Sequence, residues 1–314
     1  MHTKTAEFVS PKHPDKICDF IADSILDEYL KLDHESRVAV EVMGGHKAIT
    51  ISGEITSKAT VDVKKLVSGI VGEDYTINVF ATKQSPEIAQ GVDIGGAGDQ
   101  GIMIGHAFSE TENLMPLEYV LARNLCKKIY AKYPYDGKVQ ITVKGDKVKT
   151  VIASFQNTKS EELETLVKSL IVSEEYLINP VGVWVIGGFD ADSGLSGRKI
   201  IIDNYGPEHQ VGGGSFSGKD YTKVDRSAAY MARKIAVDLL KEKGAKQVDV
   251  KLAYAIGKPL PVMAVALIDG VETNIPDKYD LTPNGIRNYL KLNEVKFAET
   301  SSWGHFGNNF NWDH

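Results

Sequence analysis

Apolar side chains in the first quarter of the chain recur at helical spacing and then alternate with polar ones. Ile17, Ile21 and Ile25 lie in one stripe of a predicted amphipathic helix. Three valines follow at every second position. After Gly44 and Gly45, three isoleucines lie on one face of a second extended run, and the two runs predict a β-hairpin. The predicted ranges are 15–32 (helix), 37–43 and 48–55 (hairpin), 61–71 (helix) and 76–80 (strand).

The same pattern occurs twice more, with helices that start near residues 15, 115 and 225, a spacing far beyond that of solenoid repeats. It predicts an α+β fold of three pseudo-equivalent subdomains, each a mainly antiparallel sheet with helices on one face. The other face of each sheet needs cover, so we expect a large interface between subdomains or subunits. The expected domains are 1–96, 97–186 and 187–314, with a chain that can cross between them. The further predicted elements are 117–132 (helix), 138–143 and 148–155 (hairpin), 160–172 (helix), 225–243 (helix), 248–256 and 262–268 (strands) and 283–292 (helix).

Composition excludes several classes of protein. The 314 residues are 42% apolar and 25% charged, which is ordinary for a globular protein of two or three domains. A net charge of -6 argues against nucleic acid or a membrane surface as a general partner. The two cysteines, Cys18 and Cys126, do not form a disulfide framework or a Cys-based zinc site. With no apolar signal core near residue 1 and no run of about 18 apolar residues, we expect a cytoplasmic protein.

Residues 212–227, GGGSFSGKDYTKVDRS, combine a high density of glycine with a high density of charge. Glycines let backbone amides converge on an anion, and the helix that follows adds a favourable partial charge, so we expect a phosphate site. Gly213, Gly218 and Lys219 match a P-loop, but Asp220 stands where its Ser or Thr metal ligand belongs. A P-loop kinase or ATPase is therefore disfavoured. A glycine-rich surface turn remains the simpler alternative.

Other candidate residues each have a structural alternative. His13 and Asp15 precede a helix, which suits a phosphate with its metal, but a surface histidine and a helix-capping acid also fit. Glu41 and Glu54 lie on the polar side of the hairpin, as paired carboxylates or as a solvated face. The segments KQSP, GGAGDQG, DGK and DADSGLSGRK are turn-like by composition.

In combination these segments are specific. Their order and spacing resemble those of the S-adenosylmethionine synthetases over nearly the whole chain. The motifs that carry the resemblance are HPDK, GEIT, KQSP, GAGDQG, SGRK, GGGSFSGKD, TKVDRSAAY and GHFG. The resemblance implies transfer of the adenosyl group of ATP to the sulfur of L-methionine, then hydrolysis of tripolyphosphate to pyrophosphate and phosphate. It also implies two Mg²⁺ ions per site, K⁺, and a homodimer or homotetramer with active sites between subunits. Because a thioether is already nucleophilic, the first step needs alignment and a stabilised leaving group rather than a base.

The resemblance also implies roles for individual residues. Those that look catalytic are His13, Lys138, Arg198 and Lys219. Those that look ATP-binding are the same four with Asp99, Asp136, Trp184, Asp192, Lys199 and Ser215. The methionine-binding set is Glu54, Gln84, Asp192 and Lys223. The metal ligands are Asp15 and Asp225 for magnesium and Glu41 for potassium.

The chain departs from the family pattern in several places. It is short, and the loop Gln90–Gly101 lacks several residues of the segment that usually closes over the site. Pro11-Lys12 replaces a typical Glu-Gly, Tyr221 replaces a proline, and Val183 replaces an arginine near the nucleotide. The alternative function is therefore a nucleotide-binding regulatory protein of the same fold that lacks turnover.

Overall fold

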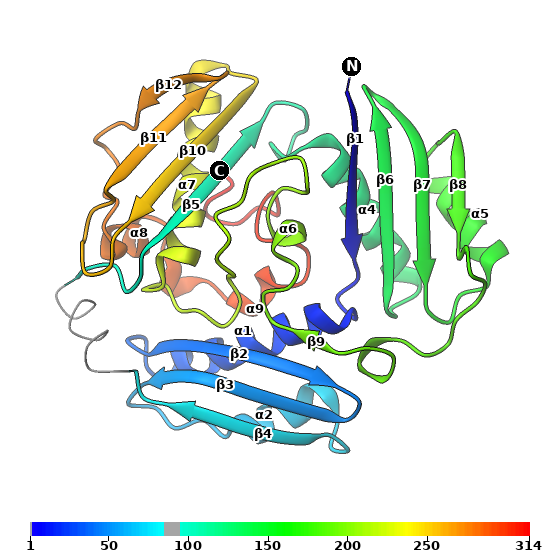
Figure 1. Cartoon of the computed structure of the whole chain (residues 1–314), viewed down its shortest axis with the longest axis horizontal. Coiled ribbons are helices and arrows are strands. Elements are labelled where there is room, and N and C mark those ends of the chain that lie inside the picture. Colours follow the sequence, from blue (N-terminus) through cyan, green and yellow to red (C-terminus); the bar gives the residue numbers. More distant parts are fainter. Residues whose placement is uncertain (1, 85–94) are drawn as a thin grey trace.

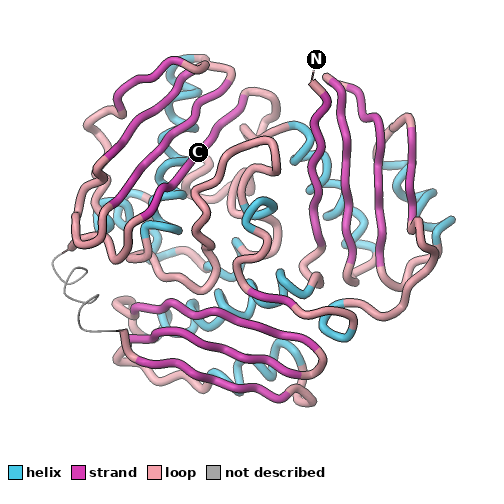
Figure 2. The backbone as a smooth tube through the Cα atoms, viewed as in Figure 1, coloured by secondary structure: helices cyan, strands magenta, loops and turns pink. Residues whose placement is uncertain are grey.

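The computed structural model describes residues 2–84 and 95–314, and their strands form three four-stranded sheets, each backed by helices (Figure 1). The sheets surround a central region of loops and short helices, as the backbone tube in Figure 2 shows. The predicted α+β plan of three subdomains is confirmed. Part of KQSP and part of the loop Gln90–Gly101 lie outside the described residues. In the described ranges, no helix combines the length and apolar character that a membrane span requires.

The first sheet contains the predicted N-terminal hairpin. Its strand order is β4 (Thr76–Thr82), β3 (Ala48–Thr56), β2 (Arg37–Gly45), β9 (Gly194–Leu195), and only the β3–β4 pair is parallel. Helix α1 (Pro14–Leu32) packs on β2, and α2 (Val63–Val71) packs on β4. The three valines of β2 are buried, which leaves Glu41 and Glu54 together on the opposite face, as their alternation predicts.

The second sheet has the order β1 (Thr3–Val9), β6 (Gly137–Lys144), β7 (Lys147–Phe155), β8 (Glu175–Ile178), and only the β7–β8 pair is parallel. Helix α4 (Leu117–Lys132) packs on β1 and β6 and spans the range that periodicity predicts. Helix α5 (Ser160–Leu170) packs beside it and ends two residues before its predicted end.

The third sheet is antiparallel throughout, with the order β12 (Val271–Asn274), β11 (Met263–Ile268), β10 (Gln247–Tyr254), β5 (Gly101–Phe108). Helix α7 (Val224–Lys243) lies against β5 and β10, and α8 (Pro283–Tyr289) packs on α7. The approach of β5 to α7 depends on Gly105, because a Cβ there would lie 2.2 Å from the Ala232 carbonyl carbon. Gly244 ends α7 in a left-handed conformation with φ 62°.

Four short elements lie in the connections: η1 (Gly188–Asp190), α6 (Ile200–Asp203), η2 (Leu292–Glu294) and α9 (Phe297–Thr300). Of these, α9 packs on α1.

Each sheet takes one strand from a different part of the chain. Strand β1 joins the central sheet, β5 joins the C-terminal sheet, and β9 returns to the N-terminal sheet. We therefore keep 1–96, 97–186 and 187–314 as proposed sequence units that the sheets cross. The exchange brings the segments around β9 and before α7 onto α1, which is where the charged residues gather.

Candidate functional site

Helix α1 begins at a capped end that carries two of the predicted site residues. His13 is the N-cap residue, and its Nδ1 accepts a hydrogen bond from the Asp15 backbone N–H at 3.2 Å. Pro14 occupies the first helical position, where its fixed φ and missing N–H fit. Asp15 lies in the first turn, where the helix dipole favours a negative charge. The capping interpretation and the site interpretation therefore apply to the same residues.

A row of four aspartates runs along α1 at a spacing of four residues, and each carboxylate accepts backbone N–H groups from a distant segment. Asp15 accepts from Leu195 at 2.9 Å, Asp19 from Gly197 at 2.8 Å, Asp23 from Gly218 at 2.8 Å, and Asp27 from Phe297 and Ala298 at 2.8 and 2.9 Å. Residues spaced by four share one helix face. Helix α1 is thus the support on which the 194–199 segment, the glycine-rich segment and α9 are docked.

The charges of two of these buried aspartates are balanced by buried cations. Lys16 binds Asp19 at 2.9 Å and Asp203 at 2.5 Å. Arg226 binds both oxygens of Asp23, at 2.6 and 2.8 Å. Sequence analysis did not select these five residues, because charged side chains are mostly exposed and no local pattern marks these as buried. The four-residue spacing of aspartates was the available signal.

The first cluster of predicted site residues surrounds the start of α1. Lys199 Nζ lies 2.5 Å from Asp15 Oδ2, and Arg198 Nη1 lies 3.8 Å from Asp15 Oδ1. Burial alone would raise the pKa of Asp15, but the Lys199 and Leu195 hydrogen bonds lower it below the ordinary value. Burial lowers the pKa of His13 to about 4, helped by the positive charge of Lys199. At neutral pH this end of the helix therefore holds a carboxylate, an uncharged imidazole and two cations.

Three more predicted residues lie around this cluster. Asp136 is buried, and its Oδ2 accepts a hydrogen bond from the Gly188 N–H at 2.9 Å. Burial raises the pKa of Asp136, and nearby Asp192 adds to the shift. Asp192 is exposed and caps its own turn at the Ser193 N–H. Lys138 is paired with Glu7 at 2.6 Å, and its charge helps to lower the pKa of His13.

The second cluster gathers residues of the glycine-rich segment against β2. Lys219 Nζ is 2.8 Å from Asp225 Oδ2. Glu41 accepts a hydrogen bond from Ser196, and burial raises its pKa although Ser196 and Lys219 oppose the shift. The 194–199 segment and the glycine-rich segment are in close contact, because a Cβ on Gly197 would lie 2.6 Å from the Ser215 Cβ. The segment 194–199 therefore joins both clusters.

The remaining predicted residues lie at the margins of these clusters. Lys223 binds Asp220 at 2.7 Å. Trp184 donates its Nε1–H to Ser154 at 3.0 Å. In the described part of the chain, Glu54, Gln84 and Asp99 make no hydrogen bond or ion pair with either cluster. Glu54 shares its sheet face with Glu41, the Gln84 N–H donates to Thr56, and Asp99 is exposed.

The carboxylates suit magnesium as partial ligands. Among residues 2–84 and 95–314, no group of three or more His, Cys, Asp or Glu is placed to enclose a metal ion. Magnesium in nucleotide sites is typically held by one or two carboxylates together with substrate phosphates and water. Asp15 and Asp225 each offer carboxylate oxygens beside a lysine that would also face the phosphates. The donor set therefore fits a metal that arrives with a nucleotide.

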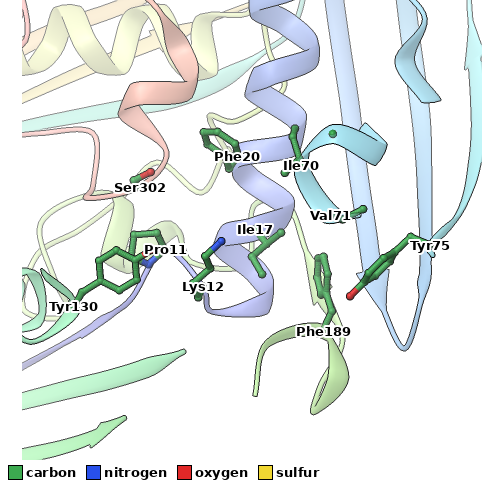
Figure 3. A pocket seen from close by; sticks show the side chains of 11 residues that line it. Pro11, Lys12, Ile17, Phe20, Ile70, Val71, Tyr75, Tyr130, Phe189 and Ser302 are labelled. Carbon is green, nitrogen blue, oxygen red and sulfur yellow. The ribbon is translucent and has the colours of Figure 1, made fainter. Parts of the chain in front are cut away.

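A cavity with aromatic walls lies beside the charged clusters rather than within them. It has a volume of about 450 Å³ and lies between α1, α2 and η1 (Figure 3). Phe20, Tyr75, Tyr130 and Phe189 supply aromatic walls, and Lys12 is the only charged residue in the lining. A triphosphate needs several cations, so this cavity does not suit it. An open hollow of about 510 Å³ instead adjoins Gly212 and the start of β5.

Comparisons with known proteins agree with the arrangement of the chain. Family models described as the N-terminal, central and C-terminal domains of S-adenosylmethionine synthetase match residues 1–85, 94–183 and 186–314. The chain is 42% identical, over an alignment of 348 residues, to the S-adenosylmethionine synthase of Mycoplasmopsis pulmonis, covering 96% of this chain and 93% of that protein. The synthase of Fusobacterium nucleatum is 40% identical, with 96% and 92% covered. A solved structure of an unusual S-adenosylmethionine synthetase from Campylobacter jejuni matches with a TM-score of 0.88 and 32% identity, covering 100% of this chain and 97% of that chain.

Proposed function

Because the chain belongs to the S-adenosylmethionine synthetase family, we propose that it transfers the adenosyl group of ATP to L-methionine and then hydrolyses the tripolyphosphate. The observation that carries the proposal is the pairing of Lys199 with Asp15 and of Lys219 with Asp225 on two loops docked to one helix. Such pairs provide cations for a triphosphate and carboxylates for its metal.

The proposed transfer needs no proton movement. A lone pair on the methionine sulfur attacks the ribose C5′, the bond from C5′ to the triphosphate oxygen breaks, and a sulfonium and tripolyphosphate result. The energetic demand is alignment of the two reactants and stabilisation of negative charge on the departing oxygen. The Arg198, Lys199 and Lys219 side chains, with Lys138 at the margin, meet the second demand.

The state of His13 defines its part. Its pKa of about 4 keeps the imidazole neutral at pH 7. Its Nδ1 accepts the Asp15 N–H, so the single ring proton resides on Nε2. His13 therefore offers one Nε2–H donor to the leaving oxygen without adding a charge that the nearby lysine would repel.

The tripolyphosphate would remain in the same cationic site for its hydrolysis to pyrophosphate and phosphate. We assign the two magnesium positions to Asp15 and Asp225 and the potassium position to Glu41. Bound magnesium would neutralise phosphate charge and hold the chain of phosphates in a fixed orientation. Asp136 and Ser215, at the edges of the two clusters, are proposed nucleotide contacts.

The methionine and adenine ends are assigned to the marginal residues. We propose Glu54, Gln84, Asp192 and Lys223 for methionine, with the Glu54 carboxylate paired to the substrate ammonium. Trp184 would stack on adenine, and its bond to Ser154 supports the proposal because it fixes the ring orientation. Asp99 is the remaining proposed nucleotide contact.

We further propose a homodimer, or a homotetramer built from it, in which the sheet faces opposite the helices meet. These faces expose apolar side chains that water does not favour, among them Met43, Phe80, Ile102 and Met263. Glu41 and Glu54 lie on such a face. A second subunit would therefore close over them and supply contacts to the site that Glu54 and Gln84 lack among the described residues.

A product assay tests the proposed function. Purified protein is incubated with ATP, L-methionine, Mg²⁺ and K⁺, and S-adenosylmethionine is measured by mass spectrometry. We expect product from the wild type and from Lys168→Met, a control on the exposed face of α5, and a loss of about 100- to 1,000-fold for Lys219→Met. Folded protein that binds ATP but yields no product would contradict the proposal and favour the regulatory alternative.

A further inference from the structure

The segment that leads into the glycine-rich loop is almost without hydrogen bonds of its own. Among the described residues, the atoms of residues 207–215 take part in one hydrogen bond, accepted by the Gln210 carbonyl from His106 at 2.9 Å. The segment also packs on β5, since a Cβ on Gly212 would lie 1.9 Å from the Ile102 carbonyl oxygen. Among the described residues, that single bond and close packing are therefore what hold the segment in position.

His106 is built to make this bond. The ring is buried on β5, with Nδ1 2.6 Å from Asp249 Oδ1 and Nε2 2.9 Å from the Gln210 carbonyl oxygen. A carbonyl only accepts, so Nε2 must carry a proton. Burial alone would raise the pKa of Asp249, but its bonds to His106 and Gln247 lower it, so it is a carboxylate that also needs a donor. The bond to the Asp249 carboxylate is therefore charge-assisted.

The surroundings keep this pair fixed. Asp249 is the cross-strand partner of His106, and Gln247 donates to both of its oxygens at 2.9 and 3.1 Å. The Tyr205 ring packs edge-on against the His106 ring, with 4.8 Å between ring centroids. The centroid of the His209 ring lies 5.6 Å from that of His106. Burial lowers the pKa of His209 to about 4, so it adds no second charge.

Other charged groups lie on the neighbouring elements. Arg233 of α7 donates to the His106 carbonyl oxygen. Lys4 and Glu110 act on the pKa of His209, in opposite directions. Asp249 is thus the one carboxylate that meets the His106 ring in the described chain.

We propose that His106 and Asp249 are positioning residues that hold residues 207–215 on β5 and thereby place Ser215 and Lys219 for the triphosphate. The pair does not touch substrate. Its catalytic consequence rests on the proposed function, whereas its hold on the segment does not.

Limited proteolysis of the full-length protein with subtilisin, with the cut sites read by mass spectrometry, tests the hold directly. His106→Phe keeps the ring but removes both bonds, and we expect cleavage within residues 210–215 to become about 10-fold faster. The matched control is His209→Phe, the same change at a half-buried histidine whose ring makes no hydrogen bond among the described residues. The control should leave the rate of cleavage within residues 210–215 unchanged. His106→Gln, which retains N–H donors, should give an intermediate rate.

Steady-state kinetics test the consequence for the site. His106→Phe and Asp249→Asn should lower kcat/KM for ATP about tenfold, and His106→Gln should restore part of the loss. Unchanged cleavage in His106→Phe, or equally fast cleavage in His209→Phe, would overturn the proposal, as would faster cleavage with an unaltered kcat/KM. A wild type that forms no product would refute the proposed function, and the cleavage rates would still decide whether the segment is held.

Discussion

The substitution Asp23→Asn tests whether α1 is the support of the site. Arg226 is fully buried and uses all of its N–H donors. Two of them bind the Asp23 carboxylate at 2.6 and 2.8 Å. The others bind Lys219 O at 3.1 Å, Thr300 Oγ1 at 3.1 Å and Tyr230 Oη at 3.0 Å. Asparagine preserves the size of Asp23 but leaves the guanidinium without a counter-charge.

The expected cost follows from the type of interaction. Removing one partner of a buried ion pair costs about 3–5 kcal/mol, and Arg226 keeps its other three bonds, so we expect the lower end. At about 2.1 cal/mol/K of unfolding entropy per residue, the 314 residues give about 0.66 kcal/mol/K. A loss of 3 kcal/mol then lowers the Tm by about 5 °C, which differential scanning calorimetry measures.

The double variant Asp23→Asn/Arg226→Met separates stability from positioning. Removing the unpaired charge should recover about half of the lost Tm, because a buried pair exchanged for uncharged groups is often close to neutral. Activity should not recover, because the Lys219 carbonyl has lost its anchor. A displacement of about 1 Å in a site can cost about 100-fold in rate.

Two results would refute this reasoning. A Tm of Asp23→Asn within 1 °C of the wild-type value would mean that the ion pair does not stabilise the fold. A double variant with wild-type kcat/KM would mean that Arg226 does not position Lys219.

Three further predictions concern the start of α1. The free energy of unfolding should fall as the pH drops from about 6.5 to 4, because the unfolded chain gains a proton on His13 that the folded protein accepts only near pH 4. His13→Asn should flatten the plot of unfolding free energy against pH over this range. An unchanged slope would contradict the effect of burial on His13. Lys199→Met should lower the initial rate of product formation by about 100- to 1,000-fold, and a loss below fivefold would remove it from the cationic site. Gly194→Ala places a Cβ 2.2 Å from the Pro14 carbonyl carbon in the first turn of α1, so it should lower the free energy of unfolding in urea by about 1–3 kcal/mol. Gly69→Ala, with open space around it, should not lower that free energy. Equal effects of the two substitutions would exclude close packing as the cause.

The helices and hairpins were predictable because their signals are local. The helix at 117–132 has the predicted bounds, and α7 begins one residue before its predicted start. Apolar periodicity and a terminal glycine are sufficient for such elements.

The exchanged strands were not predictable from spacing. Strand β9 has two residues, Gly194 and Leu195, and its pairing with β2 links positions about 150 residues apart. Strand β5 begins in a glycine-dense stretch that resembles a loop. Pairing of this kind is decided by packing between distant segments, and no local pattern records it.

Sequence motifs nominate candidate site residues, but they do not give the geometry of these residues. Motifs selected Asp15 and Lys199, and only the fold shows that they meet. Asp19, Asp23 and Arg226 were missed because buried charges break the apolar pattern, although aspartates at every fourth position pointed to a shared function. The roles of Glu54, Gln84 and Asp99 stay predictions, since a single chain provides them with no partner in the site among the described residues.

The most direct test of the central claim is to count all products of one incubation of the wild type with ATP and L-methionine. S-adenosylmethionine, pyrophosphate and phosphate should form in equal amounts, should require methionine, and should fall together in Lys219→Met. Phosphate released from ATP at the same rate without methionine, and without any S-adenosylmethionine, would contradict the assignment.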